Sequence, residues 1–137
     1  MKGIRIFMSK LHNPDLAKLF LRIALGIVFI NAGWMKIQNA EMVIGFFGSF
    51  GVPSWLTYIV MYVEFLGGIA LILGILVQYA SVLLAIVMLV AMFKVHWPNG
   101  YSLANNGYEY VLVLLLGLLA LITLGRGKYA LGHLLKK

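Results

Sequence analysis

A single acidic residue, Glu64, lies near the middle of a long apolar run, in the sequence Met-Tyr-Val-Glu-Phe-Leu-Gly-Gly. An acid at the centre of a membrane helix costs about 2.5 to 3.5 kcal/mol on translocon scales. We therefore expect Glu64 to face other helices and to be paired, hydrogen-bonded or protonated. Such a carboxyl group can relay a proton in a reaction, or it can serve only to lock a helix bundle through a salt bridge.

Two cations that suit Glu64 lie in an earlier apolar run. At about 100° per residue, Arg22 and Lys36 fall on one helical face. In depth, Arg22 lies about 9 Å and Lys36 about 12 Å from Glu64, within reach of a long side chain and a water. The sequence leaves both pairings open. The residues between the two cations on this face are Gly26, Phe29 and Gly33.

Further polar side chains gather where the apolar runs end, on the side of the membrane away from Arg22. Asn31, His96 and Glu109 are candidates for a binding pocket that opens outward and widens the Glu64 site. His96 and Glu109 align with inward stripes of their helices, whereas Asn31 lies opposite Arg22. The alternative is an ordinary headgroup belt. Neighbours of the same kind are Trp34, Lys94, Trp97, Asn105 and Asn106.

The residue inventory excludes several other chemistries. The chain has no cysteine, so it can form no disulfide, thiolate zinc site or iron–sulfur cluster. A buried bis-histidine haem needs two histidines at membrane depth, but His12 and His133 lie in the tails and leave His96 alone. We expect no metal site and no covalently bound cofactor. If electrons pass through this protein, it does not carry its own metal centre.

Four apolar runs must position these side chains. They cover residues 16–36, 55–76, 79–95 and 108–124, each long enough to cross a core of about 30 Å as a helix, the third only barely. In a chain of 137 residues with 63% hydrophobic and 11% charged residues, they leave room only for short loops. We predict an all-α fold: one domain over residues 1–137, built as an integral membrane bundle of four helices.

The charge is basic and unevenly placed. Eleven Lys and Arg against four Asp and Glu give a net charge of +7, and most cations flank the outer ends of the four runs. The positive-inside rule places both termini in the cytoplasm. The charge then directs topology and attracts anionic lipid, and we expect no nucleic-acid binding. The flanking cations are Lys2, Arg5, Lys10, Lys18, Arg126, Lys128, Lys136 and Lys137.

Two shorter segments have the composition of membrane-surface helices. Apolar residues from Met42 to Phe50, ended by Gly51 and Pro53, predict a short interfacial helix between the first two spans. A second amphipathic segment covers residues 4–11, on the cytoplasmic side. We assign neither segment a catalytic role.

Small residues follow Glu64 along its helix. Gly67 and Gly68 share its face, and Ala70 and Gly74 extend a surface on which another helix can pack closely. Such a surface serves contacts within the bundle as well as a homo-oligomer, and the sequence leaves both open.

Four short patterns occur in a particular order along the chain. The first runs over residues 22–36, where an Arg is followed by spaced glycines and then a Lys. The others are Val-Glu-Phe-Leu-Gly-Gly at 63–68, Asn-Gly-Tyr-Glu at 106–109, and Gly-Arg-Gly-Lys-Tyr-Ala-Leu at 125–131. Together they resemble the DoxX family of small bacterial and archaeal membrane proteins, over nearly the whole chain. The closing pattern departs from the family's Gly-Pro-Gly-x-x-Ser-Leu-Asp, because Arg126, Ala130 and Gly132 replace the Pro, Ser and Asp.

The resemblance implies a four-helix membrane protein of a kind often linked to quinone or thiosulfate redox metabolism and to responses to oxidants or electrophiles. We therefore expect a subunit of a redox or detoxification system in a prokaryotic inner membrane. It would bind a quinone or a similar small molecule and work with a redox partner protein. Whether it is an enzyme stays open; as an enzyme it would be a quinone-linked oxidoreductase subunit. The alternatives are a proton-coupled transporter and a structural or recruiting subunit without chemistry of its own.

Overall fold

The computed structural model describes residues 1–135, which form helices and their connections and contain no strand. This confirms the all-α prediction. Lys136 and Lys137, two of the predicted cytoplasmic cations, lie outside the described residues. The long helices are α2 (Pro14–Gln38), α4 (Ser54–Leu73), α5 (Val77–Ala91) and α6 (Glu109–Leu124). The shorter elements are α1 (Lys2–Lys10), α3 (Ala40–Gly48), η1 (Met92–His96), η2 (Trp97–Asn99), η3 (Leu103–Asn105) and α7 (Leu131–Leu135).

Three helical segments are long and apolar enough to cross a membrane. They are α2 with 25 residues, α4 with 20, and the continuous segment Val77–Asn99 with 23. The last is longer than predicted, because α5 continues through the π-helical η1 and the 3-10 turn η2. Helix α6 is shorter, with 16 residues. Its rise of about 24 Å falls below a hydrocarbon core of about 30 Å, so the adjoining turns must make up the difference.

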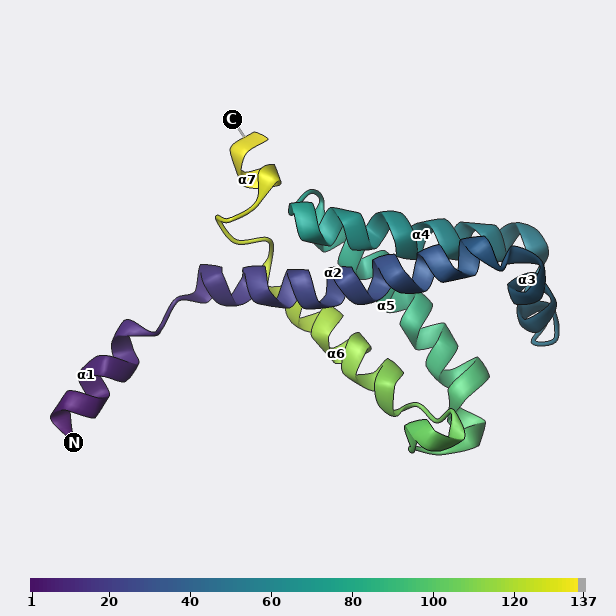
Figure 1. Ribbon diagram of the computed structural model, residues 1–137, viewed down its shortest axis with the longest axis horizontal. Coiled ribbons are helices and arrows are strands. Elements are labelled where there is room, and N and C mark those ends of the chain that lie inside the picture. The colour runs from purple at the N-terminus through teal and green to yellow at the C-terminus, as the bar shows by residue number, and fades with distance from the viewer. Residues whose placement is uncertain (136–137) are drawn as a thin grey trace.

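The long helices form two antiparallel pairs. Helix α2 packs against α4, α5 packs against α6, and the contact between α4 and α5 joins the pairs. In Figure 1 the α5–α6 pair crosses the α2–α4 pair at an angle, so α3 and the connection after α5 lie apart at the far ends. The start of α2 and the segment after α6 lie at the opposite end of the bundle, from which α1 extends away.

Glycines let α2 and α4 approach closely. A Cβ on Gly26 would lie 2.9 Å from the carbonyl oxygen of Gly68, and a Cβ on Gly68 would lie 2.7 Å from the nitrogen of Ile30. A Cβ on Gly33 would overlap the backbone of Phe65. These glycines therefore serve the contact within the bundle. The homo-oligomer stays a prediction.

Gly33→Ala is expected to lower the free energy of unfolding by about 1 to 3 kcal/mol, the usual range for overpacking. The added methyl group meets the backbone of Phe65, which cannot rotate away as a flexible side chain would. Gly45→Ala is the matched control on a helix, because a Cβ there meets nothing within 4 Å, and alanine's better helix propensity leaves it neutral or stabilising. Thermal unfolding in detergent measures both variants. An unchanged midpoint for Gly33→Ala would contradict the close contact.

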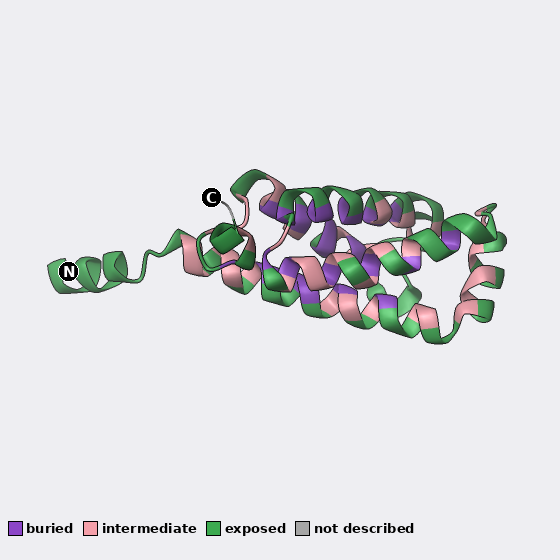
Figure 2. Ribbon diagram, turned by 90° about the horizontal axis from the view of Figure 1, so that it is seen from above, coloured by how far each residue is buried: buried purple, intermediate pink, exposed green. Residues whose placement is uncertain are grey.

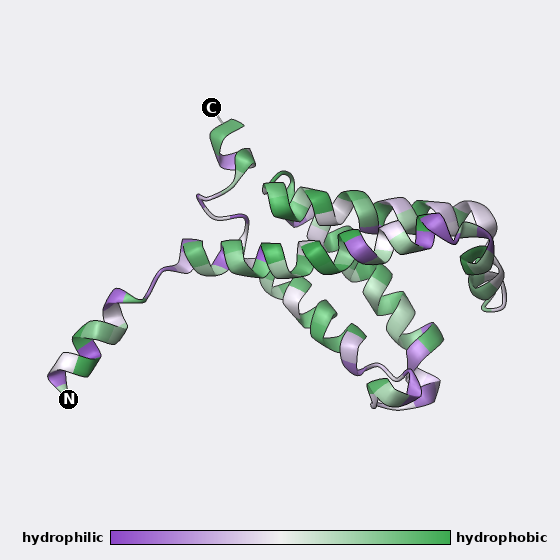
Figure 3. Cartoon of the chain, viewed as in Figure 1, coloured by the Kyte–Doolittle hydropathy of each residue, from purple (hydrophilic) through white to green (hydrophobic). Residues whose placement is uncertain are grey.

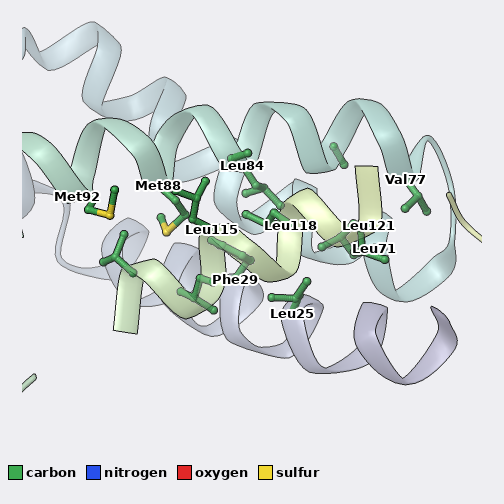
Figure 4. Packing of buried hydrophobic residues seen from close by; sticks show 14 residues of the cluster. Leu25, Phe29, Leu71, Val77, Leu84, Met88, Met92, Leu115, Leu118 and Leu121 are labelled. Atoms are coloured by element: carbon green, nitrogen blue, oxygen red, sulfur yellow. The ribbon is translucent and has the colours of Figure 1, made fainter. Parts of the chain in front are cut away.

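The core is narrow and the outer surface is also apolar. Leu71, Leu84 and Leu118 are 0% exposed in the buried cluster that the four long helices share (Figure 4). Large apolar side chains also cover the outside of the same helices, with Leu66 58% and Val113 64% exposed. Figures 2 and 3 show these exposed and hydrophobic stretches over the length of the bundle. A surface of this kind is suited to lipid acyl chains, so the bundle contacts the bilayer.

Two short helices lie outside the bundle. Helix α3 stands between the first two long helices, where a short interfacial helix was predicted, and the chain then turns at Gly51 with a φ of 84°. Helix α1 has no buried residue and extends away from the bundle in Figure 2.

Candidate functional site

Glu64 and Lys36 form a buried ion pair between α4 and α2. Lys36 Nζ lies 2.8 Å from both Oε1 and Oε2 of Glu64 and donates to each. The Glu64 side chain is 1% exposed, whereas that of Lys36 is 28% exposed. Charge-assisted hydrogen bonds away from water are stronger than those at a solvated surface. Within residues 1–135 this is the only salt bridge.

Local packing explains why these two residues meet. Helices α2 and α4 run antiparallel, and Gly33, one turn before Lys36, packs against the backbone of Phe65, the neighbour of Glu64. The close approach brings the lysine within reach of the carboxylate. Asn39 caps the C-terminus of α2, so Lys36 lies in the last helical turn. A cation is favoured there by the negative end of the helix dipole.

A cleft of about 340 Å³ opens beside this ion pair, between α4 and α5 and next to the end of α3 and the turn that follows it. Its charged lining residues are Lys36, Glu64 and Lys94, and the rest of the lining is apolar. Ile59, Ile86 and Val90 line the cleft and are also 48% to 54% exposed on the outer surface. The cleft therefore reaches the lipid-facing side of the bundle.

Arg22, the other cation considered for Glu64, binds backbone instead. Its Nε donates to the carbonyl oxygen of Leu71 at 2.8 Å, and its Nη2 donates to that of Ile72 at 3.0 Å. Both carbonyls belong to the last turn of α4, where the helix dipole favours a cation. Of the two pairings left open by the sequence, the structure therefore has Lys36 with Glu64.

Arg22 also holds the chain after α6. Its Nη1 donates to the carbonyl oxygens of Arg126 at 2.9 Å and Tyr129 at 3.0 Å. Gly125 and Gly127, with φ of 82° and 77°, turn this segment around the guanidinium group. Arg22 thereby joins α2, α4 and the segment after α6, at the end of the bundle next to α7.

His96 and Glu109 hold the connection between α5 and α6. His96 Nδ1 lies 2.9 Å from the carbonyl oxygen of Asn106, and Glu109 Oε1 accepts a hydrogen bond from the Leu103 amide at 3.0 Å. Neither residue lines the cleft. In this arrangement each side chain binds a backbone atom of the connection, and their predicted part in a wider Glu64 site stays a prediction.

Asn31 lies on the exposed side of α2. Its Nδ2 donates to Met35 Sδ at 3.6 Å, and it does not line the cleft. Of the predicted binding residues, the structure brings together Lys36 and Glu64 in the cleft. Ligand contacts by the other predicted residues stay predictions.

Lys94 lines the cleft although it was not among the predicted binding residues. The sequence left it between two interpretations, an outward-opening polar pocket and a headgroup belt, because it lies at the end of the third apolar run. Its spacing from Val87 and Ala91, seven and three residues earlier, puts all three on one helical face and was the available signal. Phe47 and Phe50, which were assigned only to the membrane surface, also line the cleft.

The chemistry of the site rests on ammonium and carboxylate groups in apolar surroundings. No group of three or more His, Cys, Asp or Glu within residues 1–135 lies together in a way that could hold a metal ion. The arrangement can donate hydrogen bonds to a ligand, balance its charge and transfer a proton.

Three span-length apolar helices, a shorter fourth and a buried ion pair define a small helical integral membrane protein. The DoxX family model matches residues 17–97, more than half of the chain. The chain belongs to the DoxX family. The matched region includes Arg22, Lys36, Glu64 and Lys94. No solved structure matches the chain.

Bacterial relatives support this assignment. The "Inner membrane protein YqjF" of Escherichia coli (strain K12) is 31% identical over 130 residues, which are 95% of this chain and 98% of the relative. The "Putative oxidoreductase CatD" of Bacillus subtilis (strain 168) is 33% identical over 100 residues, 73% of this chain and 74% of the relative. An uncharacterized protein of Haemophilus influenzae is 40% identical over 67 residues, 49% of this chain and 44% of the relative.

Proposed function

We propose that this DoxX protein is a membrane subunit of a redox or detoxification system and binds a quinone or a similar small aromatic molecule between α4 and α5. The observation that carries the proposal is the composition of the cleft. About 340 Å³ of mostly apolar space lies against the Lys36–Glu64 ion pair. Pockets for small molecules commonly have about 300 to 1,000 Å³, an apolar lining and a few placed polar groups.

A quinone ring suits these residues. Its carbonyl oxygen accepts a hydrogen bond from an ammonium group such as that of Lys36, and Phe47, Phe50 and Val63 offer an apolar wall for the ring. The opening of the cleft among lipid-exposed side chains, including Ile86, gives a lipophilic molecule a route from the bilayer.

Glu64 gives the site a group for proton transfer. Reduction of a quinone to a quinol takes up two electrons and two protons. The Lys36 ammonium group beside the carbonyl can give the first proton, and the Glu64 carboxylate can take up protons from water, returning one to Lys36 and passing the second to the ring oxygen. We propose that the electrons come from a redox partner protein, so that this chain acts as the quinone-binding subunit. The oxidoreductase description of the Bacillus subtilis relative, at 33% identity, supports this direction.

The proposed location is the inner membrane of a prokaryote, with both termini in the cytoplasm. The Escherichia coli relative, which spans 95% of this chain, is named as an inner membrane protein. Helices α1 and α7 both lie at the end of the bundle away from α3 (Figure 1), and the positive-inside rule favours the cytoplasm for the flanking Lys and Arg residues of that end.

Isothermal titration of the purified protein in detergent with short-chain ubiquinone and menaquinone analogues tests the proposal. We expect saturable binding, and Glu64→Gln should weaken it about tenfold through the altered Lys36 hydrogen bonding. Glu41→Gln is the control, because Glu41 is an exposed acid on α3 that does not line the cleft. Absence of saturable binding, or equal affinity in the wild type and Glu64→Gln, would rule out quinone binding at this site.

A further inference from the structure

The cleft holds more positive than negative charge. Lys36 and Lys94 contribute two ammonium groups, and Glu64 contributes one carboxylate. Lys36 and Glu64 neutralise each other at 2.8 Å, and Lys94 forms no salt bridge with any residue from 1 to 135. One positive charge on the cleft wall is therefore not balanced by the described part of the chain.

The position of Lys94 is set by an irregular helix. Lys94 lies in η1, the π-helical continuation of α5, and the hydrophilic stretch at that end of α5 is visible in Figure 3. Single π-helical turns within α-helices often occur at functional sites. Val87 and Ala91 precede Lys94 on the same wall of the cleft, and Lys94 itself is exposed, so this residue lies where the apolar wall meets the surface.

An anionic ligand in the cleft can pair with Lys94, whereas an uncharged ligand cannot. Because Lys94 is exposed, the attraction is that of an exposed ion pair and is modest. The remaining walls are apolar and include the two aromatic rings of Phe47 and Phe50. The positive charge of Lys94 and the aromatic rings of the lining together favour a flat ligand that carries a negative charge.

We infer that the cleft prefers an anionic aromatic ligand, such as an ionised hydroxyquinone, with its acidic oxygen on Lys94 and its ring between α4 and α5. This inference rests on the proposed function, because it concerns the same cleft and specifies the class of quinone that it takes.

Two naphthoquinones of nearly equal size separate charge from shape. Menadione carries a methyl group and is neutral, whereas lawsone carries a hydroxyl group in its place and is ionised at neutral pH. Titration calorimetry in detergent should show that the wild type binds lawsone about three- to tenfold more tightly than menadione.

Lys94→Gln is the decisive variant. We expect it to bring the two dissociation constants within about twofold, mainly by weakening lawsone, since the charge interaction is removed. Lys10→Gln is the matched control, because it removes the same charge from the exposed helix α1 and should keep the preference for lawsone. Oleate, an aliphatic anion, tests whether the ring matters and should bind more weakly than lawsone.

Each of the other possible results would contradict a different part of the inference. Equal binding of menadione and lawsone by the wild type would overturn the preference for an anion and leave quinone binding intact. A preference for lawsone that persists in Lys94→Gln would overturn the role of Lys94. Oleate binding as tight as that of lawsone would overturn the requirement for an aromatic ring. Failure of both naphthoquinones to bind would contradict the proposed function itself.

Discussion

Arg22→Gln is expected to lower the free energy of unfolding by at least about 3 kcal/mol. Arg22 is 1% exposed and donates hydrogen bonds to four backbone carbonyl oxygens, two in α4 and two in the segment after α6. Each buried acceptor left without a donor costs about 1 to 3 kcal/mol. Glutamine is shorter and has one amide group, so it cannot serve both segments. Thermal unfolding in detergent measures the loss.

Arg22→Lys should also destabilise the protein, because a lysine keeps the charge but lacks the planar fork that reaches four acceptors. Arg5→Gln is the control, because Arg5 lies on the fully exposed α1. The loss should appear first in the C-terminal segment, where trypsin should cleave after Arg126 and Lys128 faster than in the wild type. Equal midpoints for Arg22→Gln and Arg5→Gln would contradict the anchoring role.

The helical fold could be predicted because length and composition suffice to identify an apolar run as a membrane helix. Not all helix ends could be predicted, because they depend on individual backbone turns. Helix α5 runs on through a π-helical turn at Met92–His96, which no apolar pattern marks. Helix α4 ends at Leu73, three residues before the predicted end at 76, because Gly74 turns the chain with a φ of 77°, whereas α6 ends at Leu124 as predicted.

Glu64 could be selected from the sequence, because an acid inside an apolar run is expensive in lipid whatever surrounds it. The cation that pairs with Glu64 could not be selected in this way. The predicted depths of Arg22 and Lys36 differ by about 3 Å, which a shift of two residues in a helix end would reverse. In the structure, the guanidinium group of Arg22 instead donates a hydrogen bond to the carbonyl oxygen of Arg126, 104 residues later in the chain. The sequence alone gives no sign of so distant a partner.

The polar residues at the outer ends of the helices show what helical periodicity cannot predict. Helical periodicity predicted that His96 and Glu109 point inward. In the structure their hydrogen-bond partners are backbone atoms of the same connection, the carbonyl oxygen of Asn106 and the amide of Leu103. A side chain near a helix end can bind a neighbouring turn as readily as a ligand, and periodicity does not distinguish the two. Lys94, two residues before His96, belonged to the same polar group, for which a pocket and a headgroup belt were both left open, and it lines the cleft.

Lys36→Met is expected to destabilise the protein by about 3 to 5 kcal/mol, because it leaves a buried carboxylate without its cation. Glu64→Met should cost less, about 1 kcal/mol, since a lysine can extend toward the membrane surface once its partner is gone. The asymmetry follows from burial, with Glu64 1% and Lys36 28% exposed. Thermal unfolding of both single variants measures it. Equal losses would contradict the different burial of the two groups.

The double variant Lys36→Met/Glu64→Met separates the structural role of this pair from its role in binding. Replacement of a buried ion pair by apolar side chains of similar volume is often neutral, so we expect stability within about 1 kcal/mol of the wild type. Quinone binding should still be lost, because the cleft then lacks both the donor and the acid. Lys94→Met controls for removal of a lysine that lines the cleft without an ion pair, and should keep stability. A stable double variant that binds menadione like the wild type would show that the pair only locks the bundle.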